Sequence, residues 1–503
     1  MNGPARGGFP AACAVATLLG FVSLSWEIVW VRVYGVASAG AAATFGLFLG
    51  AYLAGIALGA AVSRRACRGD APHRALRATA FAMIAANTLA FLSAPAIAEG
   101  VRALPYAVTL PLVGTIAGLL GAGLPLAAHH GVAPDGRAGE RLSLLYVGNI
   151  AGSASGSLLT GFVLMEAWPL RTIALFLALA GLLACAPLIV LARFEAPLRR
   201  ALLGALLLAA IASGLACPLL FDRIYEKLSF QGSYHGQRFT RVIETRSGVV
   251  TATADGAVYG GGAYDGMLRV DPVTNANGIT RAYALAALHA NPRHVLMIGL
   301  GAGAWAQVVA HMPGVESLTV VEINHGYLEL VRGDPVVGSL LTNPKVSIVI
   351  DDGRRWMNRN PRRFDLIVQN TTHHRRAHVT NLVSVEYLDL VRRHLAPGGL
   401  FLTNATRSEK VERTAAIAFP FAWRYLSCVI AGDTPFEPDL AAWRRSLLAW
   451  RIDGAPLFDA ATPDHRRALD RILERADWEP RAALLERTRG ATVITDANMA
   501  SEF

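Results

Sequence analysis

The stretch that decides the fold is HVLMIGLGAG at residues 294–303, which is followed by the apolar run SLTVVE that ends at Glu322. An apolar run, a glycine turn, a helix-forming segment and then an acid is the order of a nucleoside-binding Rossmann unit. In such a unit the glycines let the backbone approach the ligand, and the acid accepts hydrogen bonds from ribose hydroxyls. We therefore predict a nucleoside site made of three turn glycines and this acid: Gly299, Gly301, Gly303 and Glu322.

The segments after this unit continue the alternation of apolar runs and helical stretches. Strands are expected at VSIVI, FDLIV and GLFLTN, with a helix over residues 385–394. Strands that alternate with helices predict a doubly wound parallel sheet of the α/β class, a Rossmann-like fold. Asp352 and Gly353 follow the third strand, where a carboxylate can accept a hydrogen bond from an adenine amine. The run RVIETRSGVVTATADGAVY, which precedes the unit, alternates with turn signals and predicts a small β-hairpin module.

Residues 1–222 differ from the rest of the chain because they are almost entirely Ala, Leu, Gly and Val. Their apolar runs are about 20 residues long, which is enough to cross a bilayer as helices. The first run is not expected to be a cleaved signal, because it is long and another span follows. We predict an α-helical membrane bundle of seven spans, at residues 10–34, 39–62, 77–98, 105–129, 142–165, 171–192 and 201–221.

Arginines are concentrated in alternate loops of this half. Five lie between residues 64 and 77 and three between residues 193 and 200, whereas the intervening loops have few. The positive-inside rule then predicts a multi-pass membrane protein whose N-terminus is cytoplasmic. An odd number of spans places the C-terminal domain on the periplasmic side. That conflicts with a cytosolic nucleoside ligand, so the side of the soluble domain stays open.

Composition excludes several classes of function. The chain has 503 residues, a net charge of +10 and 53% hydrophobic residues. Arginine beside membrane spans reports topology, and no basic helix or aromatic RNA-binding motif is present, so no nucleic-acid partner is expected. The five cysteines are scattered without metal-ligand spacing, so neither disulfides nor a metal site is predicted. Small residues every four positions, as at Gly148, Gly152 and Gly156, allow close helix contact within the bundle or in a homodimer.

Five motifs between Pro292 and Asn404 read NPRHVLMIGLGAG, GVESLTVVEIN, DDGRRW, FDLIV and LVSVEYLDLVRRHLAPGGL. Together they resemble the spermidine synthase (polyamine aminopropyltransferase) family, a branch of the S-adenosylmethionine-dependent methyltransferase fold. EIVWVR and the glycine-rich span after it resemble bacterial proteins in which such a domain is fused to a multispan region. We expect four parts: a membrane domain at 1–222, a β-hairpin module at 223–275, a Rossmann-like domain at 276–408 and a C-terminal extension at 409–503.

The resemblance implies a sulfonium donor, S-adenosylmethionine or its decarboxylated form. Its nucleoside would be bound by Gly299, Gly301, Gly303, Glu322, Asp352 and Gly353. In the family an aspartate-rich loop follows the fourth strand, and its first aspartate positions and deprotonates the attacking amine. Here those positions read Gln369, Asn370, Thr371 and Thr372. Where the family usually has an acid within the glycine loop, this chain has Ala302. Where the family has a tyrosine–glutamine pair before the first strand, this chain has Thr280–Arg281.

The loop that begins at Gln369 is neutral to positive where a polyamine site needs carboxylates. A polycation needs them for Coulomb attraction and for a base that accepts a proton. We therefore predict a transferase for an anionic or neutral acceptor, such as a lipid, an envelope component or a membrane protein. Gln369, His373 and His374 are the predicted catalytic residues, because imidazole titrates near neutral pH and can replace the missing base. The alternative function is a catalytically inactive nucleoside sensor or membrane scaffold. The alternative interpretation of the loop itself is a solvated basic segment beside lipid headgroups.

Overall fold

The computed structural model describes residues 8–67, 72–289, 291–370, 374–459, 461–474 and 477–503. The chain divides into two compact units. Unit 1 is formed by Met1–Ala39, Thr44–Arg238 and Glu244–Arg246. Unit 2 is formed by Gly40–Ala43, Phe239–Ile243 and Ser247–Phe503.

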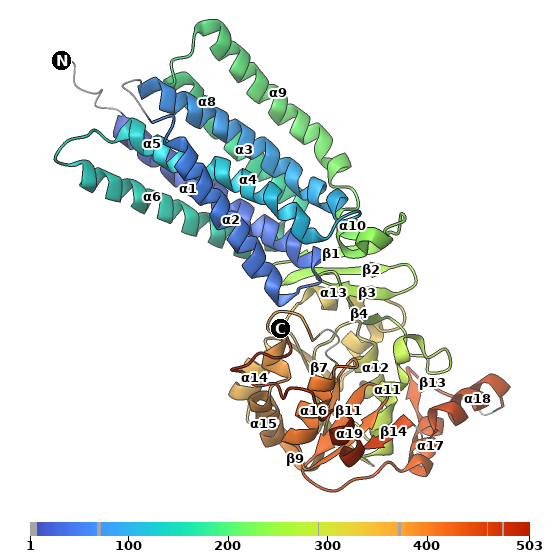
Figure 1. The fold of residues 1–503 in the computed structure, drawn as a ribbon. Helices are drawn as coiled ribbons and strands as arrows, with labels where there is room; N and C mark the ends of the chain where they lie inside the picture. Colours follow the sequence, from blue (N-terminus) through green and yellow to red (C-terminus); the bar gives the residue numbers. More distant parts are fainter. Residues whose placement is uncertain (1–7, 68–71, 290, 371–373, 460, 475–476) are drawn as a thin grey trace. The chain divides into compact units, whose positions relative to one another are not determined.

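Unit 1 is a bundle of apolar helices. Within the described residues, seven spans are long and apolar enough to cross a membrane: Gly8–Ala37, Ala42–Ser63, Arg74–Gly100, Tyr106–Gly131, Ala138–Ala167, Leu170–Leu191 and Ala196–Leu220. The predicted membrane bundle is confirmed in this sense. Its elements are α1 (Gly8–Ala37), α2 (Ala42–Ser63), α3 (Pro72–Gly100), η1 (Tyr106–Thr109), α4 (Leu110–Gly121), α5 (Gly123–Gly131), α6 (Ala138–Leu158), η2 (Leu159–Leu164), α7 (Met165–Ala167), α8 (Leu170–Leu191), α9 (Ala196–Leu220), α10 (Ile224–Phe230) and η3 (Gln231–Ser233) (Figure 1).

Glycines let helix backbones touch inside this bundle. A Cβ added at Gly152 of α6 would overlap the backbone of Thr17 in α1. One added at Gly59 of α2 would overlap the backbone of Gly118 in α4. These small residues therefore serve helix packing within one molecule, and the homodimer stays a prediction.

Unit 2 begins with a four-stranded sheet in the order β1-β2-β3-β4. β2 pairs antiparallel with β3, and β3 with β4, so the hairpins that the alternating run predicts are present. The strands are β1 (Phe239–Thr245), β2 (Gly248–Thr253), β3 (Ala257–Gly260) and β4 (Ala263–Met267).

The second sheet has eight strands in the order β14-β10-β11-β9-β8-β5-β6-β7. The strands from β7 to β9 in this order are parallel, which is the predicted doubly wound arrangement. β11, β10 and β14, which belong to the C-terminal extension, continue the sheet with antiparallel pairings. The strands are β5 (His294–Ile298), β6 (Ser317–Glu322), β7 (Val346–Ile350), β8 (Phe364–Gln369), β9 (Leu395–Asn404), β10 (Phe421–Tyr425), β11 (Cys428–Gly432) and β14 (Trp478–Pro480); β12 (Arg451–Ile452) and β13 (Ala455–Pro456) form a separate pair.

Helices cover both faces of this sheet. Because side chains alternate along a strand, Val295 and Met297 of β5 enter one core, whereas Leu296 and Ile298 enter the other. The first core is completed by α11 (Thr280–Tyr283), α12 (Ala304–Ala310), α13 (Gly326–Arg332), α17 (Leu440–Ala449) and α18 (Pro463–Ile472). The second is completed by α14 (Gly353–Arg359), α15 (Val385–His394), α16 (Glu409–Ala418) and α19 (Arg481–Arg487).

Short 3-10 segments join these elements: η4 (Ala276–Gly278), η5 (Ala284–Ala287), η6 (Gly338–Thr342) and η7 (Val379–Leu382). The strand order reverses at β5, whose neighbours are β6 and β8. In open α/β sheets, ligands bind beyond the carboxyl ends of the strands at such a reversal. The fold therefore directs attention to the loops that follow β5, β6 and β8.

Candidate nucleoside and acceptor site

The turn between β5 and α12 is built from glycines with left-handed backbone angles. The φ angles of Gly299, Gly301 and Gly303 are 87°, 52° and 76°. A Cβ at Gly303 would also lie 2.8 Å from Cγ2 of Val331, so both conformation and packing require glycine there. The turn thus brings bare backbone to the carboxyl end of β5, as the sequence predicts.

Glu322 lies at the end of β6 and is buried. Its Oε2 accepts a hydrogen bond from the backbone N–H of Leu300 at 2.7 Å, and its Oε1 accepts one from Asn324 at 2.8 Å. Burial raises the pKa of this carboxyl, although the backbone donors oppose that shift. The predicted ribose ligand therefore also holds the glycine turn against β6, and its remaining lone pairs can accept from a sugar.

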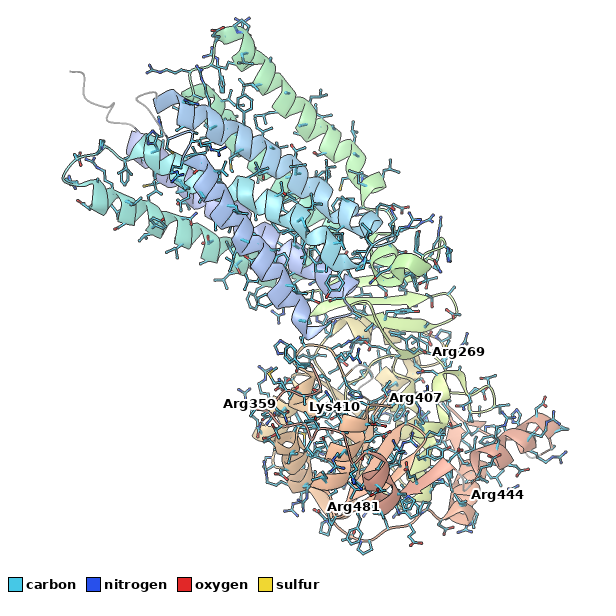
Figure 2. All side chains as sticks on the ribbon, viewed as in Figure 1. Arg269, Arg359, Arg407, Lys410, Arg444 and Arg481 are labelled. Carbon is cyan, nitrogen blue, oxygen red and sulfur yellow. The ribbon has the colours of Figure 1, made fainter. Side chains whose placement is uncertain are left out.

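A narrow pocket lies against the glycine turn, and all of its lining residues belong to unit 2. Leu300, Ala302 and Gly303 form one wall, and Trp305 of α12 adds an aromatic surface. The free space is only about 10 Å³. Because nucleoside-sized ligands need several hundred Å³, the pocket has to widen before one can enter. The rest of its lining comes from the β4 strand and the segment after it, which includes the exposed Arg269 (Figure 2), and from Asn370.

Asp265 of β4 is a pocket residue that sequence reasoning missed. Its Oδ1 lies 3.1 Å from a guanidinium nitrogen of Arg376, and the hydroxyl of Tyr327 donates a hydrogen bond to its Oδ2. Arg376 also donates to the carbonyl oxygen of Gly260 at 2.7 Å. The only feature of the sequence that could have pointed to Asp265 is that it is an acid within a strand of the hairpin module. The pocket therefore contains a carboxylate, but a cation of the same chain already neutralises it.

The end of β8 supplies the position at which the family carries its aspartate. Gln369, the predicted residue, is fully buried, and its amide donates to the carbonyl oxygen of Leu382 at 2.8 Å. Asn370 lines the pocket instead. The difference follows from strand alternation, which sends neighbouring side chains to opposite faces. Asn370, and not Gln369, thus lies in the pocket lining, and a catalytic role for Gln369 stays a prediction.

Of the two histidines predicted as bases, only His374 lies within the described residues. His374 is buried at 7% exposure in the segment after β8, and it is not among the residues that line the pocket. His373 lies outside the described residues, as do Thr371 and Thr372. A catalytic role for either histidine stays a prediction.

Asp352 and Gly353 lie at the start of α14. Asp352 caps that helix, because its side chain accepts a hydrogen bond from the backbone N–H of Arg355 at 2.7 Å. A Cβ at Gly353 would come within 2.7 Å of Cγ2 of Ile298, so packing against β5 already requires glycine. Asp352 borders a separate and more open depression of about 350 Å³. The structure thus gives both residues local structural roles, and adenine binding by them stays a prediction.

No group of three His, Cys, Asp or Glu side chains that could hold a metal ion is found among the described residues. What unit 2 does present is a parallel sheet with a glycine turn after β5 and a buried acid at the end of β6. These features define the class of nucleoside-binding, Rossmann-like α/β domains.

Known proteins carry similar sequences. Residues 283–418 match the family model described as the spermine/spermidine synthase domain. The polyamine aminopropyltransferase of Mycobacterium tuberculosis (strain CDC 1551 / Oshkosh) is 29% identical over 211 residues, which cover 39% of this chain and 39% of that protein. The polyamine aminopropyltransferase of Escherichia coli O9:H4 (strain HS) is 34% identical over 117 residues, which cover 23% of this chain and 40% of that protein. A spermidine synthase solved in complex with the transition state analogue AdoDATO gives a TM-score of 0.36 at 16% identity, over 46% of this chain and 84% of that chain.

Residues 283–418 are thus similar to the spermine/spermidine synthase domain, and the resemblance drawn from the motifs of this region is confirmed. The chain spans about 39% of the length of the first of these curated relatives. Unit 1 adds to this domain the seven helices that are apolar enough to span a membrane.

Proposed function

We propose that this chain is an integral-membrane transferase of a bacterial cell membrane. It binds an adenosyl sulfonium donor, S-adenosylmethionine or its decarboxylated form, and transfers an alkyl group to an acceptor other than a polyamine. The family match supports the donor. The acceptor is argued from one observation: Asn370 and Asp265 line the pocket and Asp265 is paired with Arg376, whereas a polyamine would need free carboxylates.

The chemistry is a displacement at the carbon beside the sulfonium sulfur. A nucleophile of the acceptor forms a bond to that carbon, the carbon–sulfur bond breaks, and its electron pair stays on sulfur to give a neutral thioether. Such a reaction depends on aligning nucleophile and carbon. The glycine turn would hold the nucleoside and Trp305 would cover it, while Asn370 would face the acceptor. A lipid, an envelope component or a membrane protein would reach an enzyme that is itself anchored in the bilayer.

Two measurements on the purified full-length protein test this function. Calorimetry with S-adenosylmethionine, its decarboxylated form and methylthioadenosine should show binding of at least one of them. With the decarboxylated donor and putrescine, mass spectrometry should detect little or no spermidine. Turnover of about 1 per second, which is ordinary for enzymes, would contradict the proposed acceptor, and the absence of any binding would contradict the proposed donor.

The second candidate function is a catalytically inactive protein that binds a nucleoside and senses it or acts as a scaffold. The observation that favours it is the engagement of Asp265 by Arg376 and Tyr327, because this acid cannot serve as a base while it holds both partners. Binding of a donor without transfer to amines, carboxylates, phosphates or extracted membrane lipids would support this alternative.

A further inference from the structure

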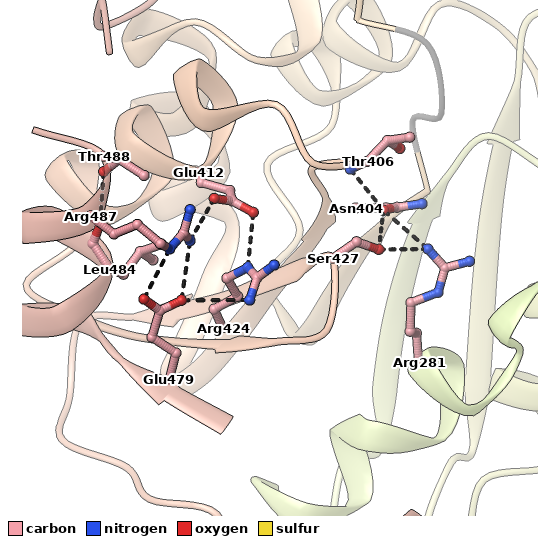
Figure 3. A network of polar contacts seen from close by, with 10 residues as sticks. All are labelled: Arg281, Asn404, Thr406, Glu412, Arg424, Ser427, Glu479, Leu484, Arg487 and Thr488. Carbon is pink, nitrogen blue, oxygen red and sulfur yellow. Dashed lines mark hydrogen bonds and ion pairs between the residues drawn. The ribbon is translucent and has the colours of Figure 1, made fainter. Parts of the chain in front are cut away.

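Arg281 determines which side-chain atoms donate and which accept in a series of hydrogen bonds. The series runs through Asn404 to Asn370, which lines the pocket. One terminal nitrogen of Arg281 donates to the Oγ of Ser427 at 2.7 Å and to the Oδ1 of Asn404 at 3.3 Å (Figure 3). Its other nitrogens donate to the carbonyl oxygens of Asn277 and Gly278. A guanidinium has only donors and stays charged, so every atom that it contacts must act as an acceptor.

The amide of Asn404 can therefore take only one orientation. Its Oδ1 accepts from Arg281 and also from the backbone N–H of Thr406 at 3.1 Å, and neither donor can reverse its role. Ser427 donates to the same oxygen at 3.1 Å. Amide orientations are assigned from such networks, and here two obligate donors agree. Asn404 is 1% exposed, so its nitrogen must find its partner inside the protein.

That partner is Asn370. The Nδ2 of Asn404 donates to the Oδ1 of Asn370 at 2.9 Å. Since an amide nitrogen only donates, this contact determines which end of the Asn370 side chain is its oxygen. The Oδ1 of Asn370 thus faces the buried amide of Asn404, and Nδ2 is the group that this side chain can offer to the pocket that Asn370 lines. Within the loop where the resemblance implies aspartates, Asn370 therefore offers the pocket an N–H donor and no carboxylate.

Asp265 lines another part of the pocket, and for an independent reason it also disfavours an ammonium group there. The carboxylate of Asp265 is held by Arg376, whose side chain is 30% exposed, and by Tyr327. An ammonium group would have to displace a guanidinium that is already in place, and charged hydrogen bonds are the stronger ones. Both parts of the pocket therefore disfavour an ammonium group on the acceptor and offer a donor to an anionic one.

We infer that the acceptor presents a preformed oxyanion, a carboxylate or phosphate oxygen, to the Nδ2 of Asn370. This inference rests on the proposed donor. The oxyanion attacks the carbon beside the sulfonium, a carbon–oxygen bond forms, the carbon–sulfur bond breaks, and its electron pair stays on sulfur. The products are an ester and a neutral thioether, and no proton is transferred. An oxyanion nucleophile needs no base, which matches a pocket whose described carboxylate, Asp265, is already engaged.

Matched probes test the inference by binding. The full-length protein is saturated with methylthioadenosine and titrated with hexanoate, hexyl phosphate or hexylamine, which share one chain and differ in the head group. We expect at least one of the two anions to bind about tenfold or more tightly than the amine, a difference of about 1.4 kcal/mol. The two anionic probes distinguish a carboxylate from a phosphate acceptor. Asn370→Asp places an acceptor where the donor was and should reverse the preference.

Asn343→Asp is the matched control. Asn343 lies just before β7, the last strand in the order of the sheet, and is not among the residues that line the pocket. Its Oδ1 accepts a hydrogen bond from the backbone N–H of Lys345, and an aspartate can accept the same bond. This variant should keep the preference for the anion. A preference for hexylamine in the unmodified protein, no binding of either anion, or an unchanged preference in Asn370→Asp would overturn the inference. Failure of methylthioadenosine to bind would instead contradict the proposed function.

Discussion

Glu322 uses both carboxylate oxygens to hold the loops that follow β5 and β6, and this decides what its loss does. Glu322→Ala leaves the N–H groups of Leu300 and Asn324 without their acceptor and removes the expected ribose ligand. We expect donor binding to weaken by about 1–3 kcal/mol, measured by calorimetry with methylthioadenosine. Glu316→Ala, at the surface before β6, should leave binding unchanged. Equal affinity in Glu322→Ala and the unmodified protein would show that this acid does not contribute to the site.

The same residue predicts a dependence of stability on pH. Burial raises the pKa of the Glu322 carboxyl in the folded protein above that of an exposed glutamate, which is about 4.3. A raised pKa means that folding is favoured by the protonated form, so this contribution is complete below the ordinary value and is lost as pH rises through the raised one. Glu322→Gln cannot titrate, so its stability should fall less than that of the unmodified protein over this pH range. Thermal unfolding at a series of pH values measures it, and parallel curves for the two proteins would contradict the shift.

Residues whose roles are local could be predicted, and residues whose roles depend on the fold could not. The glycine turn and Glu322 belong to one strand–turn–helix–strand unit, so their spacing carries the information. Asp265 reaches the pocket from a different sheet, and only the fold brings it to Arg376. Gln369 and Asn370 are neighbours at the end of β8, and successive side chains point to opposite faces of a strand. The sequence alone did not show which of the two would line the pocket.

A cluster of two arginines and two glutamates joins four elements of the C-terminal extension (Figure 3). Glu412 of α16 is buried and pairs with Arg424 of β10 at 2.9 Å and with Arg487 of α19 at 2.7 Å. Glu479 of β14 pairs with the same two arginines at 3.5 Å and 3.1 Å. Each arginine thus bridges two acids, and the cluster ties the outer antiparallel strands to the helices that cover them.

Removing the buried charge should loosen this part of the sheet. Glu412→Gln keeps the shape of the side chain but loses charged hydrogen bonds, which contribute about 1.5–3 kcal/mol. Hydrogen exchange of the β10 amides should speed up by about one to two powers of ten, because local opening becomes easier. Glu486→Gln, whose side chain is 76% exposed in α19, is the control and should change nothing. Identical exchange in both variants would mean that apolar packing alone holds these strands.

The antiparallel strands themselves show where prediction of elements stops. The parallel strands are apolar runs that alternate with helices, and that order identifies them. β10 and β11 are five residues long and β14 is three. Periodicity alone does not assign runs of this length, and these strands lack the alternation with helices that identifies the equally short β5 and β7. Their place in the sheet therefore depends on contacts made far along the chain.

At the scale of the whole molecule, the outermost helix decides on which side of the membrane unit 2 is expected. Only 11% of the apolar part of α9 is buried within the structure. Leu207, Leu208, Leu215 and Leu219 are between 64% and 79% exposed. Exposed leucines along a helix of 25 residues are stable where lipid covers them. This favours α9 as a seventh span over a segment that lies on the surface.

With seven spans and arginine-rich loops at residues 64–77 and 193–200, we expect the N-terminus in the cytoplasm and unit 2 outside it. Alkaline phosphatase and green fluorescent protein fusions after Phe503 should give phosphatase activity without fluorescence. The same fusions after Glu195, before α9, should give the reverse and serve as the internal control. Fluorescence after Phe503 would overturn this topology and place the pocket where a sulfonium donor is made. Phosphatase activity there would mean that the proposed transferase must obtain its donor from across the membrane.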